Sequence, residues 1–135
     1  MNYFHHWDSL EAEDHGLPES LCKIKLLTGE KLQLIWAIFQ PGGQYERHSH
    51  PHEQFSFMIQ GRMRLYVGDQ QKIVEPGDIW YAPPNVVHGG DLLGDEPVIF
   101  VDVFTPIREE ILAEMARNRA KRLAAESKSQ GQTNR

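Results

Sequence analysis

The amino-acid sequence predicts an all-β domain, a sandwich or a barrel, followed by a C-terminal α-helix. The middle of the chain holds short runs rich in β-branched and aromatic residues, with Gly and Pro turn signals about every eight to twelve residues. The last quarter changes to Glu, Arg and Ala, with apolar residues near helical spacing. Because 135 residues can bury a core as one unit, we predict a single barrel domain with N-terminal strands over residues 1–106. A helix is expected over 107–126 and a disordered tail over 127–135.

Composition excludes several classes of function. The net charge is -5, and the longest basic block is Lys121–Arg122, so the chain is poorly suited to a nucleic-acid backbone. No apolar stretch approaches the ~20 residues that span a bilayer, and the first residues show no signal peptide. The one cysteine, Cys22, cannot form an internal disulfide. These features predict a cytoplasmic protein that binds neither nucleic acid nor membranes.

The predicted strands are short runs that each stop at a turn signal. Gly68-Asp69 suits a tight hairpin, and Pro76-Gly77 suits a turn. Several runs are apolar on both faces, as expected when one face lines a barrel and the other packs on a second sheet or a partner. We therefore expect a homodimer. The predicted strands are Leu32–Phe39, Gln54–Ile59, Arg62–Val67, Lys72–Val74, Ile79–Ala82 and Val98–Phe104.

The predicted helix is weakly amphipathic. Pro106 stands just ahead of it, where proline suits a first helical turn. Residues 127–135 are polar and aperiodic, which predicts a frayed end. The sequence does not choose between packing of this helix on the barrel and packing on a partner. The residues near helical spacing are Ile107, Ile111, Leu112, Met115, Arg119 and Leu123.

Histidines cluster after the first predicted strand. His48 and His50 alternate, so on one strand they face the same side, and Gln54 shares their parity. With His88, they form a set of side chains suited to a divalent transition metal. His52 follows a proline and is expected either behind the metal ligands or at the rim, while Glu53 is expected to face solvent or a partner. We assign no site to the isolated histidines His5, His6 and His15.

Two spaced motifs in this region resemble those of the cupin family. The first is Gly42-x5-His48-x-His50-x3-Gln54-x6-Gly61, and the second is Gly77-x5-Pro83-x-Asn85-x2-His88. The resemblance implies a double-stranded β-helix (jelly-roll) barrel that holds one metal ion through His48, His50, Gln54 and His88. It leaves the metal open among Ni, Zn, Fe, Co and Mn. Gln54 stands where Glu is usual, and Asn85 where Gly is common.

A third motif begins within the last predicted strand. Asp102 lies within an apolar run, where a carboxylate is costly to bury unless it is paired or functional. It could be a strand-end carboxylate neutralised by Arg108 alone. The pattern Asp-Val-Phe-Thr-Pro-x-Arg-Glu from Asp102 is similar to the pectin-degradation cupins, although Thr105 replaces a frequent Ser. The resemblance implies that Asp102 and Arg108 are catalytic, and that Arg108 and Phe104 bind the substrate.

These cupins open and ketonise 4,5-unsaturated uronates, and the expected reaction here is therefore a non-oxidative ring opening of an unsaturated sugar acid. Three imidazoles and a neutral amide leave the charge of a divalent cation uncompensated, which favours Lewis-acid chemistry on an anionic substrate over dioxygen activation. Two alternatives stay open: a metal-dependent dioxygenase on the same scaffold, and a non-catalytic cupin that binds a small acid.

Overall fold

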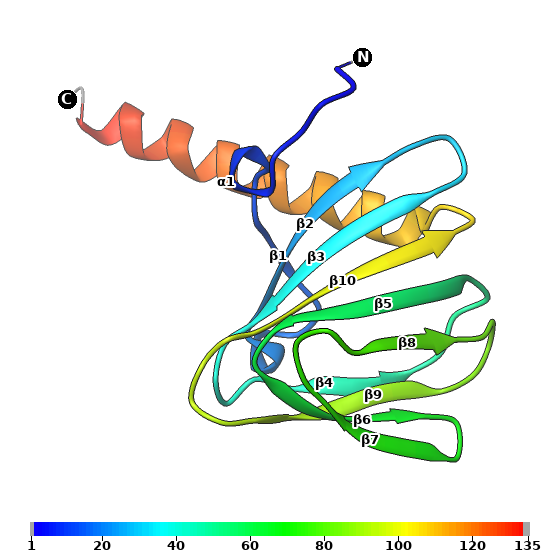
Figure 1. Ribbon diagram of the computed structural model, residues 1–135. Helices are drawn as coiled ribbons and strands as arrows, with labels where there is room; N and C mark the ends of the chain where they lie inside the picture. Colours follow the sequence, from blue (N-terminus) through cyan, green and yellow to red (C-terminus); the bar gives the residue numbers. More distant parts are fainter. Residues whose placement is uncertain (1, 134–135) are drawn as a thin grey trace.

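The computed structural model describes residues 2–133 and consists of ten strands, two short 3-10 helices and one long α-helix (Figure 1). The elements are η1 (Trp7–Ser9), β1 (Glu13–His15), η2 (Pro18–Ser20), β2 (Cys22–Thr28), β3 (Gln33–Phe39), β4 (Tyr45–His48), β5 (Glu53–Gln60), β6 (Arg62–Val67), β7 (Gln70–Val74), β8 (Ile79–Ala82), β9 (His88–Leu93), β10 (Val98–Thr105) and α1 (Glu109–Thr133). Within these residues, no helix combines the length and apolar character needed to cross a bilayer.

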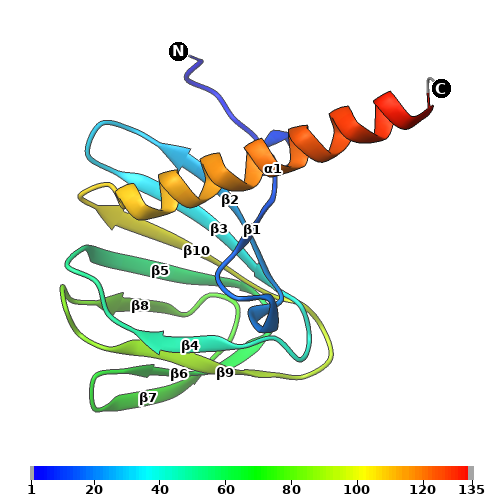
Figure 2. The ribbon, with the colours of Figure 1, turned by 180° about the vertical axis from the view of Figure 1, so that it is seen from behind.

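The strands form two antiparallel sheets that face each other as a jelly roll. One sheet has six strands in the order β1-β2-β3-β10-β5-β8, and the other has four in the order β4-β9-β6-β7. The two sheets splay apart at one side (Figures 1 and 2). The all-β prediction is confirmed. The expected barrel, however, is a pair of packed sheets rather than a closed cylinder, because no strand pairing joins the two sheets within residues 2–133.

The predicted strands all form, most of them with slightly shifted ends. Period-two alternation directs Gln54, Ser56 and Met58 of β5 inward, whereas Phe55 of the same strand is half exposed. Phe100 of β10 lies at the centre of the core, between the rings of Tyr45 at 5.2 Å and Trp80 at 5.4 Å. Because Tyr45 belongs to the four-stranded sheet, this aromatic contact holds the two sheets together.

The helix differs from its prediction in both ends and in the way it docks. It begins at Glu109 and continues to Thr133, so much of the expected tail is helical. No proline interrupts residues 127–133, and a helix that has already formed extends at little cost. Residues 134 and 135 of the predicted tail lie outside the described residues. Ile111 is buried, but Leu123 is 52% exposed, so the expected apolar stripe reaches the protein only near its start.

Polar side chains dock the rest of α1 onto β1. Glu114, Asn118 and Arg122 recur every four residues and therefore lie on one helix face. Glu114 contacts His15, Asn118 donates to the backbone carbonyl of Asp14 at 2.6 Å, and Arg122 pairs with Glu13. The helix therefore crosses the β1–β2–β3 end of the six-stranded sheet and holds the short edge strand β1 in place (Figure 2).

Candidate metal centre

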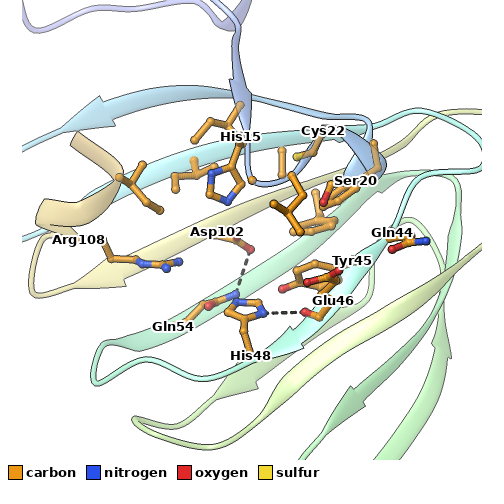
Figure 3. Close-up of a pocket in the computed structure, with 18 of the residues that line it drawn as sticks. His15, Ser20, Cys22, Gln44, Tyr45, Glu46, His48, Gln54, Asp102 and Arg108 are labelled. Carbon is orange, nitrogen blue, oxygen red and sulfur yellow. Dashed lines mark hydrogen bonds between the residues drawn. The ribbon is translucent and has the colours of Figure 1, made fainter. Parts of the chain in front are cut away.

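A cavity of about 230 Å³ lies between the two sheets and is also lined by β1 and by the start of α1. His48, Gln54, Asp102 and Arg108 contribute polar side chains to its wall (Figure 3). The cavity therefore brings into one place most of the residues that the sequence motifs single out.

Three histidines meet beside this cavity. His48, His50 and His88 offer ring nitrogens that all lie within 4.8 Å of one another. His48 ends β4 and is the register partner of His88, which begins β9, and their ring centroids are 4.4 Å apart. His50 lies in the turn between β4 and β5, so strand parity with His48 is the wrong reason for their convergence. Its ring centroid lies 4.9 Å from that of His88.

Backbone carbonyls set the tautomer of all three rings. The Nδ1 atoms of His48, His50 and His88 lie 2.8, 3.1 and 2.9 Å from the carbonyl oxygens of Glu46, His52 and Val86. A carbonyl only accepts hydrogen bonds, so each Nδ1 carries the proton and donates it. The Nε2 lone pairs are left to face the centre, which is how imidazoles are oriented for a metal ion.

Burial keeps these imidazoles neutral. Desolvation lowers the pKa of His50 and of His88 to about 4, and it also lowers the pKa of His48. The Nε2 atom of His88 is buried without a hydrogen-bond partner among the described residues. An unpaired buried acceptor is costly, and a bound cation would satisfy it.

Gln54 completes the set through the orientation of its amide. Its Nε2 donates to the carboxylate of Asp102 at 3.2 Å and to Ser56 Oγ at 2.9 Å, which directs Oε1 towards His50. Oε1 and the Nε2 of His50 are 3.0 Å apart, and both are acceptors in this arrangement. Two lone pairs that face each other repel unless a cation lies between them. The donor set of three imidazoles and one amide oxygen therefore fits a divalent transition metal.

Asp102 lies on β10 directly opposite Ser56 of β5 and is only 6% exposed. Burial raises the pKa of its carboxyl group to about 7, while the hydrogen bond from Ser56, the positive charge of Arg108 and the hydrogen bond from Gln54 act in the opposite direction. The Ser56 hydroxyl and the Gln54 amide both donate to its Oδ1. This carboxyl group is thus held at the wall of the cavity and against the amide of a candidate ligand.

Arg108 reaches the same cavity, and its positive charge lowers the pKa of Asp102, but it forms no ion pair with that carboxylate among residues 2–133. Its Nε donates to Glu110 at 2.7 Å, and its guanidinium lies over the ring of Phe104 at 5.0 Å. No ion pair joins Arg108 to Asp102 among residues 2–133, so Arg108 alone does not saturate the buried carboxylate. The backbone N–H of Arg108 donates to the fully buried Gln33 at 3.1 Å, which anchors the segment that carries the guanidinium.

Gly89 allows the close approach of β4 that places His48 near His88, and Gly90 allows β6 to pack closely on the same strand. A Cβ atom on Gly89 would lie 2.8 Å from the backbone of Arg47 on β4. A Cβ atom on Gly90 would lie 2.7 Å from the sulfur of Met63. Because a real Cβ atom does not approach so closely, any side chain at position 89 would push β4 and its histidine away from β9.

Several residues of the site escape the motif analysis. Ser56 lies two residues after Gln54, so the period-two pattern of β5 already places a small polar side chain inside. Tyr45 lines the cavity, and burial raises the pKa of its hydroxyl well above its usual value. His15 also lines the cavity. It contacts Glu114, which is 99 residues away in the sequence, so no local pattern reveals this contact. His52 is buried, and its backbone carbonyl contacts His50 Nδ1, so it lies behind a candidate ligand, which is one of the two places expected for it, and not at the rim. Glu53 is exposed, as expected.

Comparisons with known proteins agree with this architecture. The family model described as "Cupin domain" matches residues 35–104. The pectin degradation protein KdgF of Dickeya dadantii (strain 3937) is 27% identical over 92 residues, covering 67% of this chain and 83% of that protein. An RmlC-like cupin from Shewanella frigidimarina has a TM-score of 0.73 at 28% identity, covering 82% of this chain and 96% of that one. KdgF from Halomonas sp. has a TM-score of 0.71 at 24% identity, covering 80% and 98%.

Proposed function

The chain belongs to the cupin family, and on that premise we propose that it is a metal-dependent enzyme that opens and ketonises an unsaturated uronate without oxidation. The observation that carries the proposal is one cavity that combines a buried carboxyl group and an arginine and that lies beside a cluster of metal-type ligands. The likeness to a pectin degradation protein supports this substrate class.

His48, His50, Gln54 and His88 would hold one divalent cation, either Ni, Zn, Fe, Co or Mn. When bound, the cation supplies Lewis-acid polarisation of substrate oxygen atoms. The four ligands are neutral, so the protein does not compensate the charge of the bound cation. The cation would therefore attract an anionic substrate.

Arg108 is assigned to the substrate carboxylate. Its Nε is used by Glu110, so the two terminal NH2 groups are the donors that we assign to a bidentate contact. Phe104 lies against the same guanidinium and restricts its orientation. A lysine at this position would supply charge but not the planar pair of donors.

Asp102 is assigned to proton transfer. Ring opening removes the proton of the anomeric hydroxyl group and breaks the ring C–O bond, and ketonisation adds a proton to carbon. The proton lost equals the proton gained, so the reaction is an isomerisation and needs no oxidant. One carboxyl group at the cavity wall can therefore serve as base and then as acid, which contributes about a hundredfold to ten-thousandfold in rate.

The deciding experiment combines metal analysis of the purified protein with an ultraviolet assay on unsaturated uronates released by a polysaccharide lyase. We expect the alkene absorbance to fall faster than its spontaneous rate, under argon as well as in air. With protein stripped of metal by a chelator, the alkene absorbance should fall only at the spontaneous rate. Oxygen consumption coupled to turnover would indicate the dioxygenase alternative. Tight uronate binding without turnover would indicate the non-catalytic one.

The proposal includes a homodimer. Phe55 and Ile79 are 50% and 68% exposed on the outer face of the six-stranded sheet, and Phe55 packs against Tyr81 at 4.8 Å between ring centroids. Strand β8 is also an unpaired edge of this sheet. A second copy that packs on this face would cover it. Light scattering should give a dimer mass that Ile79→Glu reduces to a monomer mass, while Leu123→Glu on the exposed helix should not.

The proposal also places the protein in the cytoplasm and apart from nucleic acid and membranes. The single cysteine is an unpaired, buried thiol, which is typical of a reducing compartment. The acidic net charge of -5 supports a small-molecule partner rather than a nucleic acid.

A further inference from the structure

His15 and Glu114 form a hydrogen-bonded pair at the wall of the cavity, far from the cupin motifs in the sequence. His15 ends β1 and Glu114 lies in the second turn of α1. Both elements lie outside residues 35–104, which the family model matches. The His15 ring points into the cavity on the side of Asp102 (Figure 3).

The pair is held by more than one contact. His15 Nδ1 lies 2.6 Å from one carboxylate oxygen of Glu114, and the backbone N–H of Gly16 donates to the other at 3.0 Å. With both oxygens engaged, the carboxylate has one orientation. Because a carboxylate accepts, Nδ1 of His15 carries the proton and donates it. The atom that the ring offers to the cavity is therefore Nε2, an acceptor in the neutral ring.

The helix has docking contacts other than this pair. Asn118 and Arg122 already join α1 to Asp14 and Glu13 in the following two turns. A hydrogen-bonded pair that served only to dock the helix would not need its imidazole ring at the wall of a cavity that Asp102 and Arg108 also line. An imidazole held by a carboxylate through Nδ1 is oriented for a partner at Nε2.

The chemistry of the cavity indicates that partner. Arg108 is assigned to the substrate carboxylate and Asp102 to proton transfer. A sugar acid also has ring hydroxyl groups, for which no partner has yet been assigned. We propose that His15 is a substrate-binding residue whose Nε2 accepts a hydrogen bond from a sugar hydroxyl, and that Glu114 is the positioning residue that fixes its ring. The inference rests on the proposed function, because the ligand class is the same sugar acid.

Replacing His15 by Asn tests the inference while keeping the structural contact. The side-chain NH2 of Asn takes the place of Nδ1 and can still donate to Glu114, but nothing replaces Nε2. His15→Gln tests the other nitrogen: its terminal amide reaches the position of Nε2, but it does not replace the Nδ1 donor to Glu114. The control is His5→Ala, because His5 is an exposed histidine of the N-terminal segment.

Calorimetry with two non-reacting probes separates hydroxyl recognition from a general effect. D-galacturonate has the ring, carboxylate and hydroxyl groups, whereas tetrahydropyran-2-carboxylate lacks the hydroxyl groups. In metal-loaded protein, His15→Asn should weaken galacturonate binding about three- to tenfold, the value of one hydrogen bond, and leave the second probe unchanged. His15→Gln should retain part of the affinity. Glu114→Gln should weaken galacturonate binding in wild type but not in His15→Asn, because it acts through His15.

Unchanged galacturonate affinity in His15→Asn overturns the inference. An equal loss for both probes also overturns it, because this indicates a change in cavity shape. Failure of the wild type to bind galacturonate does the same. The proposed function is judged separately, by wild-type turnover of the unsaturated uronate. If the wild type is active but His15→Asn binds galacturonate with unchanged affinity, only this inference is overturned.

Discussion

The side-chain amide of Gln54 and the carboxylate of Asp102 lie on neighbouring strands and share a hydrogen bond of 3.2 Å. The other end of the same amide lies 3.0 Å from the Nε2 of His50. A ligand of the candidate metal centre and the candidate proton-transfer group are therefore in direct contact. The following predictions distinguish the role of each.

Asp102→Asn should leave the metal in place and remove the chemistry. The carboxamide oxygen can still accept from Ser56 and from Gln54, so the cavity wall keeps its shape. Turnover should fall by at least about a hundredfold, the lower range for loss of a general acid–base group. Metal per chain and the ultraviolet assay measure the two effects. Asp95→Asn, in an exposed loop, is the matched control. Full turnover in Asp102→Asn with full metal occupancy contradicts the assignment.

His88→Ala should lose metal and activity together. The variant removes the buried Nε2 that has no partner among the described residues, and with it one of four ligands. Wild-type protein should unfold at a higher temperature when nickel or zinc is added, and His88→Ala should show little of that shift. His6→Ala, at an exposed histidine, should behave as wild type. A His88→Ala variant that binds metal stoichiometrically would remove His88 from the ligand set.

Gln54→Glu should destabilise the metal-free protein. The change removes the amide donor to Asp102 and places two carboxyl groups against each other in a buried site. The free energy of unfolding should fall by about 1–3 kcal/mol, and more as rising pH ionises both groups. Added metal should recover part of the loss, because a cation compensates the new charge. Urea titrations at several pH values measure this, with Gln70→Glu on exposed β7 as the control. Equal stability of the two metal-free variants contradicts the prediction.

Cys22 should resist alkylation in the folded protein. Burial raises the pKa of its thiol from 9.0 to about 12, so at a given pH the reactive thiolate is about a thousandfold rarer than in the unfolded chain. Because the folded pKa is the higher one, the thiol contributes stability below pH 9.0 that is lost as the pH rises towards 12. Mass spectrometry after iodoacetamide treatment, with and without urea, measures the rate. Equal rates in both conditions contradict the prediction.

Local patterns predict the strands well, because the alternation of a strand and the residues of a turn involve only neighbours in the sequence. The alternation in β5 and the Gly-Asp turn after β6 report directly on the backbone. The motifs also bring His48, His50 and His88 together, although His50 arrives from a turn and not from a strand. Sequence patterns do not reveal a role that depends on a distant partner. His15 is the clearest case, because its neighbours in sequence say nothing of Glu114.

The helix shows the same limit for packing. Apolar spacing predicts a stripe from Ile107 to Leu123, but docking beyond the first turns uses Asn118 and Arg122 instead. Polar contacts of this kind have no periodic hydrophobic signal. Only the position of β1 in space reveals them.

The candidate ligands are divided between the two sheets: His48 and His88 belong to the four-stranded sheet, and Gln54 belongs to the six-stranded one. No strand pairing joins these sheets among residues 2–133, so a bound ion would add a cross-link between two layers that otherwise meet through side-chain packing and the connecting segments of the chain. Separation of the layers would then require release of the ion, and amide hydrogens of β4 and β9 would exchange with solvent more slowly as metal concentration rises. The ion would thus govern the mechanical integrity of the sandwich as well as its chemistry.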